Sequence, residues 1–239
     1  DVLVLATHPD DAESTCGGTI AKLVERGASV GVLDSCRGEM GTRGTPRTRA
    51  RECAAATREL RLAFRGNLGL ADGRIVPTVE AREAIARWIR RLRPMLFIAP
   101  WRRDLHPDHA AVGVMARQAY FLAGLRRLAP ELAPHRPKRV LYYPSHDLFR
   151  VSFVSVLEER HFQAKLRALA CYRSQLEPAG PGDRGAHFIH RQDLRQRIEI
   201  RARFFGALAT VRWGEPFRAE GALPDVDPLS IPSREAGGG

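Results

Sequence analysis

The chain has 239 residues, of which 44% are hydrophobic, which suits a globular protein with a substantial core and excludes a disordered one. No apolar run approaches the roughly 18–20 residues of a membrane-spanning helix, so we expect no membrane partner. The formal net charge of +11 comes mainly from arginines, and because they are scattered rather than gathered into one tract we expect no nucleic-acid partner.

The first part of the chain reads as a strand, a helix and a second strand. Residues 1–7 are almost continuously apolar, as in a buried parallel strand. Residues 14–27 have helical spacing and end at Gly27, a common helix stop. With a second apolar strand at 29–35 this is a β-α-β unit, which predicts a parallel sheet with a right-handed crossover.

The rest of the chain continues the alternation after a polar, glycine-rich loop at 36–48. We expect further helices at 49–60, 78–92, 106–125, 158–176 and 191–208. We expect further strands at 66–72, 94–100, 136–145 and 152–157. This pattern predicts an α/β fold with a Rossmann-like, doubly wound and mostly parallel sheet flanked by helices.

Neither a repeat nor a linker divides the sequence, so we expect a single domain over residues 1–239. The Pro/Gly-rich stretch from about residue 214 is expected to be a tail on the surface. The four cysteines form no CxxC pair, which favours free thiols in a reducing compartment and a cytoplasmic location.

Two HPD motifs follow buried strands, the first after residues 1–7 and the second after residues 94–100. Ligands of open α/β sheets bind beyond the carboxyl ends of the strands, which is where both motifs lie. His8, Asp11 and His109 supply two imidazoles and one carboxylate and leave a fourth position open for water. That is the arrangement of a catalytic zinc centre, although Fe²⁺ accepts the same ligands.

The other polar residues of the motifs suggest catalytic roles. Asp10, next to Asp11, is placed to act as general base on the water. His106 is free to face the substrate, and Asp108 is expected to hold it in one tautomer and favour its protonated form. Such a His106 would stabilise a tetrahedral oxyanion and could later protonate the leaving amine.

Each motif has a simpler interpretation when taken alone. An HPD sequence after a strand is also typical of a turn followed by a helix cap. Asp10 or Asp108 would then be the capping residue, and Pro9 or Pro107 the proline of a first helical turn. Two such motifs at strands of one sheet favour the metal site.

The sequence also resembles a known family. The stretches "ATHPDDAE" with "GGTIAKL", and "HPDH", resemble the two motifs of the LmbE/PIG-L zinc deacetylases, and "RGEMGTRGTPRTRARE" resembles the region between them. "HRPKRVLYYPSHDLFRVSFV" and "LRALACYRSQL" resemble the branch that removes acetate from N-acetylglucosaminyl malate in bacillithiol biosynthesis. The resemblance spans about residues 1–215.

The resemblance implies the same zinc ligands and catalytic residues as the motifs themselves. It adds Arg49, which matches the position expected to grip the substrate, and a guanidinium suits the carboxylates of malate. It also implies homo-oligomers. Glu13 is expected to be a supporting group that pairs with Arg49 or Arg51, or else a solvated helix residue.

Two departures bear on the substrate. Leu105 stands where the bacillithiol branch often has an arginine, for which Arg102 or Arg103 could compensate. Around residues 186–200 the tyrosine-bearing segment of the branch is missing, and His187 or His190 could substitute.

The sequence therefore predicts a zinc-dependent hydrolase that removes the N-acetyl group from an N-acetylglucosamine conjugate, namely N-acetylglucosaminyl malate. One alternative is a deacetylase or amidase acting on another N-acetylated sugar, a chitooligosaccharide or a thiol conjugate. A more distant alternative, suggested by the net charge, is a nucleic-acid-binding protein with a vestigial zinc site.

Overall fold

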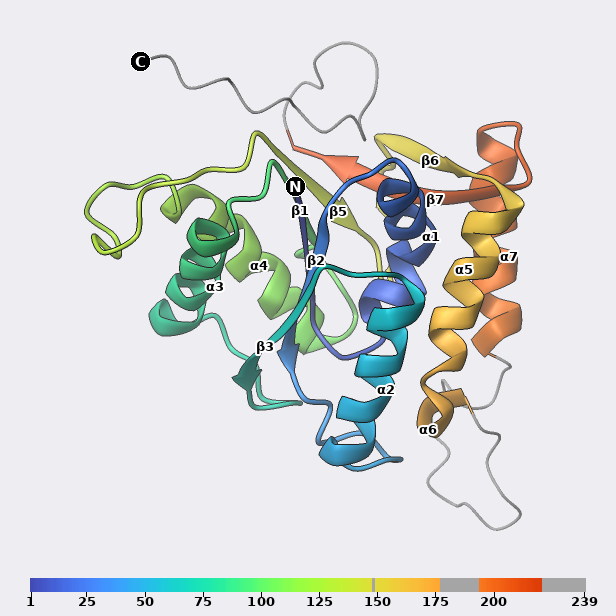
Figure 1. Cartoon of the computed structure of the whole chain (residues 1–239), viewed down its shortest axis with the longest axis horizontal. Coiled ribbons are helices and arrows are strands. Elements are labelled where there is room, and N and C mark those ends of the chain that lie inside the picture. Colours follow the sequence, from blue (N-terminus) through green and yellow to red (C-terminus); the bar gives the residue numbers. More distant parts are fainter. Residues whose placement is uncertain (148, 177–193, 221–239) are drawn as a thin grey trace.

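The computed structural model describes residues 1–147, 149–176 and 194–220, which form a sheet of seven strands in the order β3-β2-β1-β4-β5-β7-β6 (Figure 1). The strands are β1 (Val2–Ala6), β2 (Val30–Cys36), β3 (Phe64–Leu70), β4 (Leu96–Pro100), β5 (Arg139–Tyr143), β6 (Phe153–Leu157) and β7 (Trp213–Ala219). The helices are α1 (Asp11–Glu25), α2 (Pro46–Glu59), α3 (Val79–Leu92), α4 (Pro107–Leu122), α5 (Glu159–Ala170), α6 (Arg173–Leu176) and α7 (Leu194–Leu208).

The strands from β3 to β5 pair in parallel, whereas β7 runs antiparallel to β5 and β6. Helices α3 and α4 cover one face of the sheet, and α1, α2 and α5 cover the other (Figure 1). Side chains of β1 alternate between the two cores: Leu3 and Leu5 pack on the α3–α4 side, and Val2 and Val4 on the α1 side. The predicted mostly parallel α/β sheet is confirmed.

The sheet order reverses between β1 and β4, which pair directly with each other. The chain leaves β1 toward α1 on one face and leaves β4 toward α4 on the other. Open α/β sheets bind ligands at the carboxyl edge where the loops diverge in this way. Both HPD motifs lie at this edge, one after β1 and one after β4.

The largest correction to the sequence analysis concerns residues 213–219, which form β7 instead of beginning a surface tail. Glu215 of this strand is buried and accepts hydrogen bonds from the backbone N–H groups of Gly18 and Thr19, at 3.0 and 2.7 Å. A Cβ atom on Gly18 would lie 2.4 Å from the Leu157 side chain, so glycine allows this close approach of α1 to the sheet. A glutamate and a proline within the strand hid it from pattern analysis.

The other elements occur where they were expected, with ends shifted by a few residues. The helix expected at 158–176 is interrupted between α5 and α6, where the buried Tyr172 turns inward and donates a hydrogen bond to Glu13. The loop at 177–186, like His187 and His190, lies outside the described residues. Within the described ranges, no helix is both long and apolar enough to cross a membrane.

Candidate metal centre

The first motif forms a tight turn between β1 and α1. Asp10 has a left-handed backbone (φ 102°, ψ −19°), and α1 begins at the next residue. The backbone N–H of His8 donates to the Asp11 carboxylate at 2.8 Å. A non-glycine residue in this conformation costs on the order of 1–3 kcal/mol, and such residues cluster at functional sites. The turn brings the side chains of His8 and Asp11 together.

The second motif forms the start of α4. The capping interpretation named Asp108 as the N-cap residue, but another residue has this position. His106 is the N-cap residue: its Nδ1 accepts a hydrogen bond from the backbone N–H of Asp108 at 3.2 Å, and Pro107 is the first helical residue. Asp10 occupies the N-cap position of α1, as the capping interpretation allows, but its side chain makes no capping bond, and Asp108 is not the N-cap residue of α4.

Three candidate ligand atoms from the two motifs meet in a compact triangle. His8 Nδ1 lies 3.1 Å from His109 Nε2, and Asp11 Oδ2 lies 3.4 Å from the first nitrogen and 3.3 Å from the second. Bonds of about 2.0–2.1 Å to a tetrahedral zinc ion would place its ligand atoms about 3.3–3.4 Å apart. The described residues thus fit the metal that the sequence predicts.

The protonation states of His109 and Asp11 also suit metal binding, because a ligand needs a free lone pair. Burial lowers the pKa of His109 to about 4, so its imidazole is neutral. Burial raises the pKa of Asp11, but the neighbouring His109 and His8 outweigh it and the pKa is lowered overall. Other groupings of ligand-type atoms share these histidines: His8 with His106 and His109, His8 with Cys36 and Asp72, and His109 with Asp104 and His146.

Asp72, at the end of β3, is a site residue that the sequence analysis missed. Its Oδ1 lies 3.1 Å from His8 Nε2, the nitrogen that points away from the ligand triangle. The backbone N–H of Met40, in the glycine-rich loop, fixes the other oxygen of Asp72 at 2.8 Å. A carboxylate on the outer nitrogen of a histidine sets its tautomer and leaves the inner nitrogen for the metal.

Carboxylates surround His8. Burial alone would lower its pKa, but hydrogen bonds to Asp108, Asp11 and Asp72 raise the pKa of His8 well above its ordinary value. The surroundings therefore favour positive charge at this position. In a chain with a formal net charge of +11, a cluster of carboxylates of this kind indicates a cation site rather than a phosphate site.

Asp10 lies next to the triangle and pairs with Arg49. Burial raises the pKa of Asp10 to about 7, against the opposing charge of Arg49. Arg49, of which only 4% is exposed, lies 3.3 Å from Asp10 Oδ2 and also donates to the backbone carbonyl of Pro9. The pKa of Asp10 suits a general base near neutral pH. Arg49 is near the site, but its described contacts are all with other residues of the protein.

The expected pairing of Asp108 with His106 is wrong. The carboxylate of Asp108 accepts hydrogen bonds from the N–H groups of Gly73 and Ile75, at 2.7 and 3.2 Å, and lies 3.6 Å from His8 Nε2. Only the backbone N–H of Asp108 contacts His106. Burial and the charge of His8 lower the pKa of His106, so the structure favours neutral His106 with its proton on Nε2.

Glu13 does not pair with Arg49 or Arg51, as the sequence analysis expected. Its Oε1 lies 2.5 Å from Arg65 of β3, whose guanidinium also binds Asp34. Glu13 is fully buried, so this network is an internal support for the turn before α1 rather than a substrate contact. Sequence spacing cannot show a contact across 52 residues.

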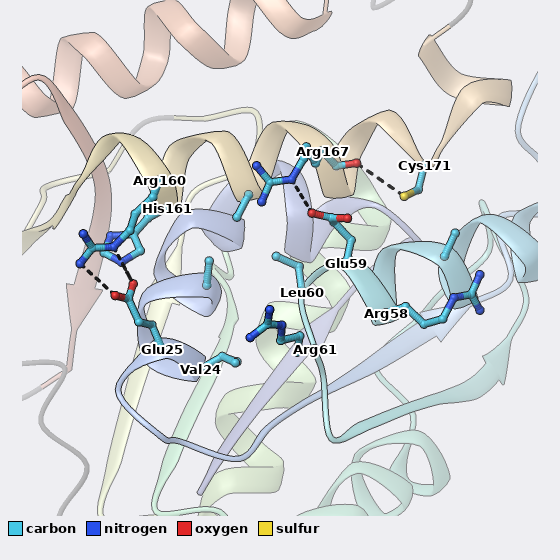
Figure 2. Close-up of a pocket in the computed structure, with 13 residues that line it drawn as sticks. Val24, Glu25, Arg58, Glu59, Leu60, Arg61, Arg160, His161, Arg167 and Cys171 are labelled. Carbon is cyan, nitrogen blue, oxygen red and sulfur yellow. Dashed lines mark hydrogen bonds and ion pairs between the residues drawn. The ribbon is translucent and has the colours of Figure 1, made fainter.

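A surface groove of about 890 Å³ between α1, α2 and α5 lies apart from this centre (Figure 2). Its lining includes four arginines. Arg160 and His161 contact Glu25, and Arg167 contacts Glu59, so much of its positive charge is neutralised (Figure 2). None of the residues of the two motifs lines this groove.

Comparison with known proteins agrees with the geometry. The family model of PIG-L, GlcNAc-PI de-N-acetylase, matches residues 3–120. Diacetylchitobiose deacetylase from Thermococcus kodakarensis is 32% identical over 190 residues, which cover 73% of this chain and 69% of that protein.

Solved structures share the fold along nearly the whole chain. The conserved protein TT1542 from Thermus thermophilus has 39% identity and a TM-score of 0.84, covering 96% of this chain and 98% of that one. N,N'-diacetylchitobiose deacetylase from Pyrococcus horikoshii, solved with its inhibitor MPG, has 24% identity and a TM-score of 0.78, covering 92% and 83%. The second likeness shows the fold alone. The chain belongs to the PIG-L family and is a deacetylase, a hydrolase of amide bonds.

Proposed function

We propose that this enzyme is a zinc-dependent N-deacetylase of N-acetylglucosamine conjugates, with His8, Asp11 and His109 as the metal ligands. The observation that carries the proposal is the triangle of ligand atoms, with sides of 3.1, 3.3 and 3.4 Å. A zinc ion held there would activate water and polarise the amide carbonyl. Fe²⁺ fits the same ligands and is the alternative metal.

Asp10 and His106 have separate roles in the proposed hydrolysis. The oxygen of water bonds to the acetamide carbon, and Asp10 takes the proton that the water loses. The C–N bond then breaks, the proton passes from Asp10 to the sugar nitrogen, and acetate and the free amine leave. The Nε2–H group of His106 donates to the developing oxyanion. This tautomer favours the oxyanion role of His106 over the acid role, and the contact of Asp108 with His8 makes Asp108 a support for the metal ligand.

The proposed substrate is N-acetylglucosaminyl malate, as in bacillithiol biosynthesis. Its support is the resemblance of the later sequence stretches to that branch. Leu105 is exposed, and Arg102 is paired with Glu220, so Arg102 is engaged elsewhere. Arg103 is exposed, and its side chain has no partner among the described residues. It is therefore the better candidate to bind the malate carboxylates. A homo-oligomer in the cytoplasm also remains a prediction.

A second candidate is N,N'-diacetylchitobiose or another short N-acetylated chitooligosaccharide. The observation in its favour is the 32% identity to a diacetylchitobiose deacetylase. The two candidates share the reaction and differ in the group joined to the sugar. A nucleic-acid-binding role has less support, because carboxylates line the site.

The test is acetate release by the zinc-loaded protein from three compounds: N-acetylglucosaminyl malate, N-acetylglucosamine and N,N'-diacetylchitobiose. We expect the malate conjugate to be preferred. Preference for the disaccharide would overturn the pathway assignment but keep the chemistry. No acetate from any of them, with zinc or with Fe²⁺, would refute the proposed function.

The matched variant is Asp10→Asn, which removes the base but no metal ligand. We expect its zinc content, measured by atomic spectrometry, to equal that of the wild type. Its rate of acetate release should fall by about 10²–10⁴-fold, the usual contribution of a general base. An unchanged rate would mean that Asp10 is not the base.

A further inference from the structure

A fourth imidazole joins the site from a loop that neither motif includes. His146 lies three residues after β5, the strand next to β4, at the carboxyl edge of the sheet. Its ring stacks against that of His106, with centroids 5.8 Å apart and an angle of 27°. It also meets the ring of His109 edge-on at 5.0 Å. His146 therefore borders both the proposed metal ligand and the proposed oxyanion donor.

Contacts from the loop after β4 and from α7 hold His146 and the two residues before it in place. The carboxylate of Asp104, whose side chain is only 2% exposed, binds the Nδ1 of His146 at 2.9 Å and its backbone N–H at 3.0 Å. From α7, Arg201 donates to the backbone carbonyls of Pro144 and Ser145, both at 2.6 Å. Both the ring and the backbone N–H of His146 are thus held in place, which favours a functional role for this side chain.

These contacts also bear on which nitrogen of His146 is available. A carboxylate only accepts hydrogen bonds, so the bond to Asp104 places a proton on Nδ1, and in the neutral imidazole the lone pair is then on Nε2. The side chain of His146 is 21% exposed, against 2% for His109, so it lies toward the open side of the site. Within the described part of the chain, no hydrogen bond to Nε2 is found.

We propose that His146 binds the substrate, with its Nε2 accepting a hydrogen bond from a sugar hydroxyl next to the acetamido group. This inference rests on the proposed function. A lone pair on Nε2 can accept a hydrogen bond, and the hydroxyl groups of the sugar are donors, whereas the acetamide carbonyl and the carboxylates of malate are acceptors. His146 thus recognises the sugar ring itself and selects a 2-acetamido sugar with a free neighbouring hydroxyl, whatever is attached to it.

The test exploits two amides that each imitate one imidazole nitrogen. The side-chain amide of asparagine reaches the place of Nδ1, so His146→Asn keeps a donor for Asp104 but loses the acceptor. The longer glutamine reaches the place of Nε2, so His146→Gln keeps an acceptor toward the substrate. We expect kcat/KM for N-acetylglucosamine to fall by about 3- to 10-fold in His146→Asn and by less in His146→Gln. Thermal unfolding and zinc content should be unchanged in His146→Asn.

Substrate analogues separate a substrate contact from a positioning effect. Two analogues of N-acetylglucosamine, one without the 3-hydroxyl and one without the 1-hydroxyl, each lack one candidate donor. On the analogue that lacks the hydroxyl bound by His146, wild type and His146→Asn should be equally active. The proposal is overturned if His146→Asn matches the wild type on the parent sugar, or if it loses the same factor on both analogues. The second outcome would mean that His146 acts through His106.

Binding of the same sugars, measured by calorimetry, tests the role of His146 independently of the reaction. A wild type that binds N-acetylglucosamine but releases acetate from none of the three compounds refutes the proposed function, and the comparison of the two variants in binding still decides the role of His146. A wild type that does not bind the sugar at all overturns the role of His146.

Discussion

At the residue scale, Arg49 is the residue whose environment differs most from the expected one. A substrate clamp would present its guanidinium to the open site, yet Arg49 is 4% exposed and contacts Asp10 and the carbonyl of Pro9. Asp10 itself has a strained left-handed backbone. The geometry therefore favours a role for Arg49 in holding the proposed base in place, and the substrate contact stays a prediction.

The variant Arg49→Lys tests which role is correct. Lysine keeps the positive charge but loses the planar fork that spans Asp10 and Pro9. We expect kcat to fall by up to about 100-fold, because small displacements of a reacting group are costly, with little change in KM. Steady-state kinetics on N-acetylglucosaminyl malate separate the two constants. Arg51→Lys, on the exposed side of the same helix, is the control. A rise in KM alone would instead support the substrate clamp.

The contact of Asp72 with His8 leads to a second prediction. Asp72→Ala removes the nearer of the two carboxylates at the outer nitrogen of His8 and leaves Asp108 at 3.6 Å, so the tautomer of His8 is held less firmly. Loss of such a partner usually weakens metal binding by about 10–100-fold. Competition with a chromophoric chelator would measure the zinc affinity. Asp147→Ala, which removes an exposed carboxylate beside His146, should leave it unchanged. Equal affinities in the two variants would rule out this support for His8.

A site residue could be predicted from the sequence when it lies close in the chain to other site residues. Asp10 and Asp11 stand out because they follow His8 directly in a short motif. Asp72 and His146 each stand alone in the sequence, and only the order of the strands brings them to His8 and His106. Asp72 is the last residue of the strand predicted at 66–72 and His146 directly follows the strand predicted at 136–145, so their place at the carboxyl edge was the one available signal.

At the scale of elements, β7 depends on one buried ion pair. Lys165 of α5 and Glu215 of β7 lie 2.6 Å apart, with side chains 4% and 2% exposed. Glu215 also accepts bonds from Gly18 and Thr19 of α1. The carboxylate of Glu215 therefore links β7 to α1 and α5, two helices that lie far from β7 in the sequence.

Glu215→Ala should destabilise the protein strongly, because Lys165 would be left as a buried, unpaired charge. Removing one partner of such a pair typically costs about 3–5 kcal/mol, which corresponds to a fall in Tm of roughly 6–20 °C for a chain of this length. Thermal unfolding followed by circular dichroism measures it. Glu199→Ala, which breaks the exposed pair with Arg203, should lower Tm by about 1–2 °C at most. Similar shifts in both variants would mean that the buried pair contributes little.

The same strand shows where pattern analysis of elements fails. The strands from β1 to β5 were predictable because most are apolar and alternate with amphipathic helices. β7 carries Glu215 and Pro216, residues that usually argue against a strand. The glutamate is tolerated because four donors satisfy it, and those donors come from α1 and α5. A one-dimensional pattern contains no such information.

At the scale of the whole molecule, charge is distributed unevenly. The chain has a formal net charge of +11, yet the centre between β1 and β4 gathers the carboxylates of Asp10, Asp11, Asp72 and Asp108 around His8. These groups repel one another unless a cation lies among them. The proposed metal is thus expected to matter for stability as well as for the reaction.

Removal of the metal should therefore lower the melting temperature. A ligand at 100 times its Kd stabilises the folded state by about 2.7 kcal/mol, which corresponds to roughly 5–11 °C in Tm for a protein of this size. The measurement is thermal unfolding of the protein after dialysis against a chelator, and again with zinc restored at that excess. In Asp11→Ala, which lacks one corner of the triangle, zinc should restore much less. An equal gain in this variant would show that the ion binds elsewhere, because the two histidines alone cannot replace the lost carboxylate.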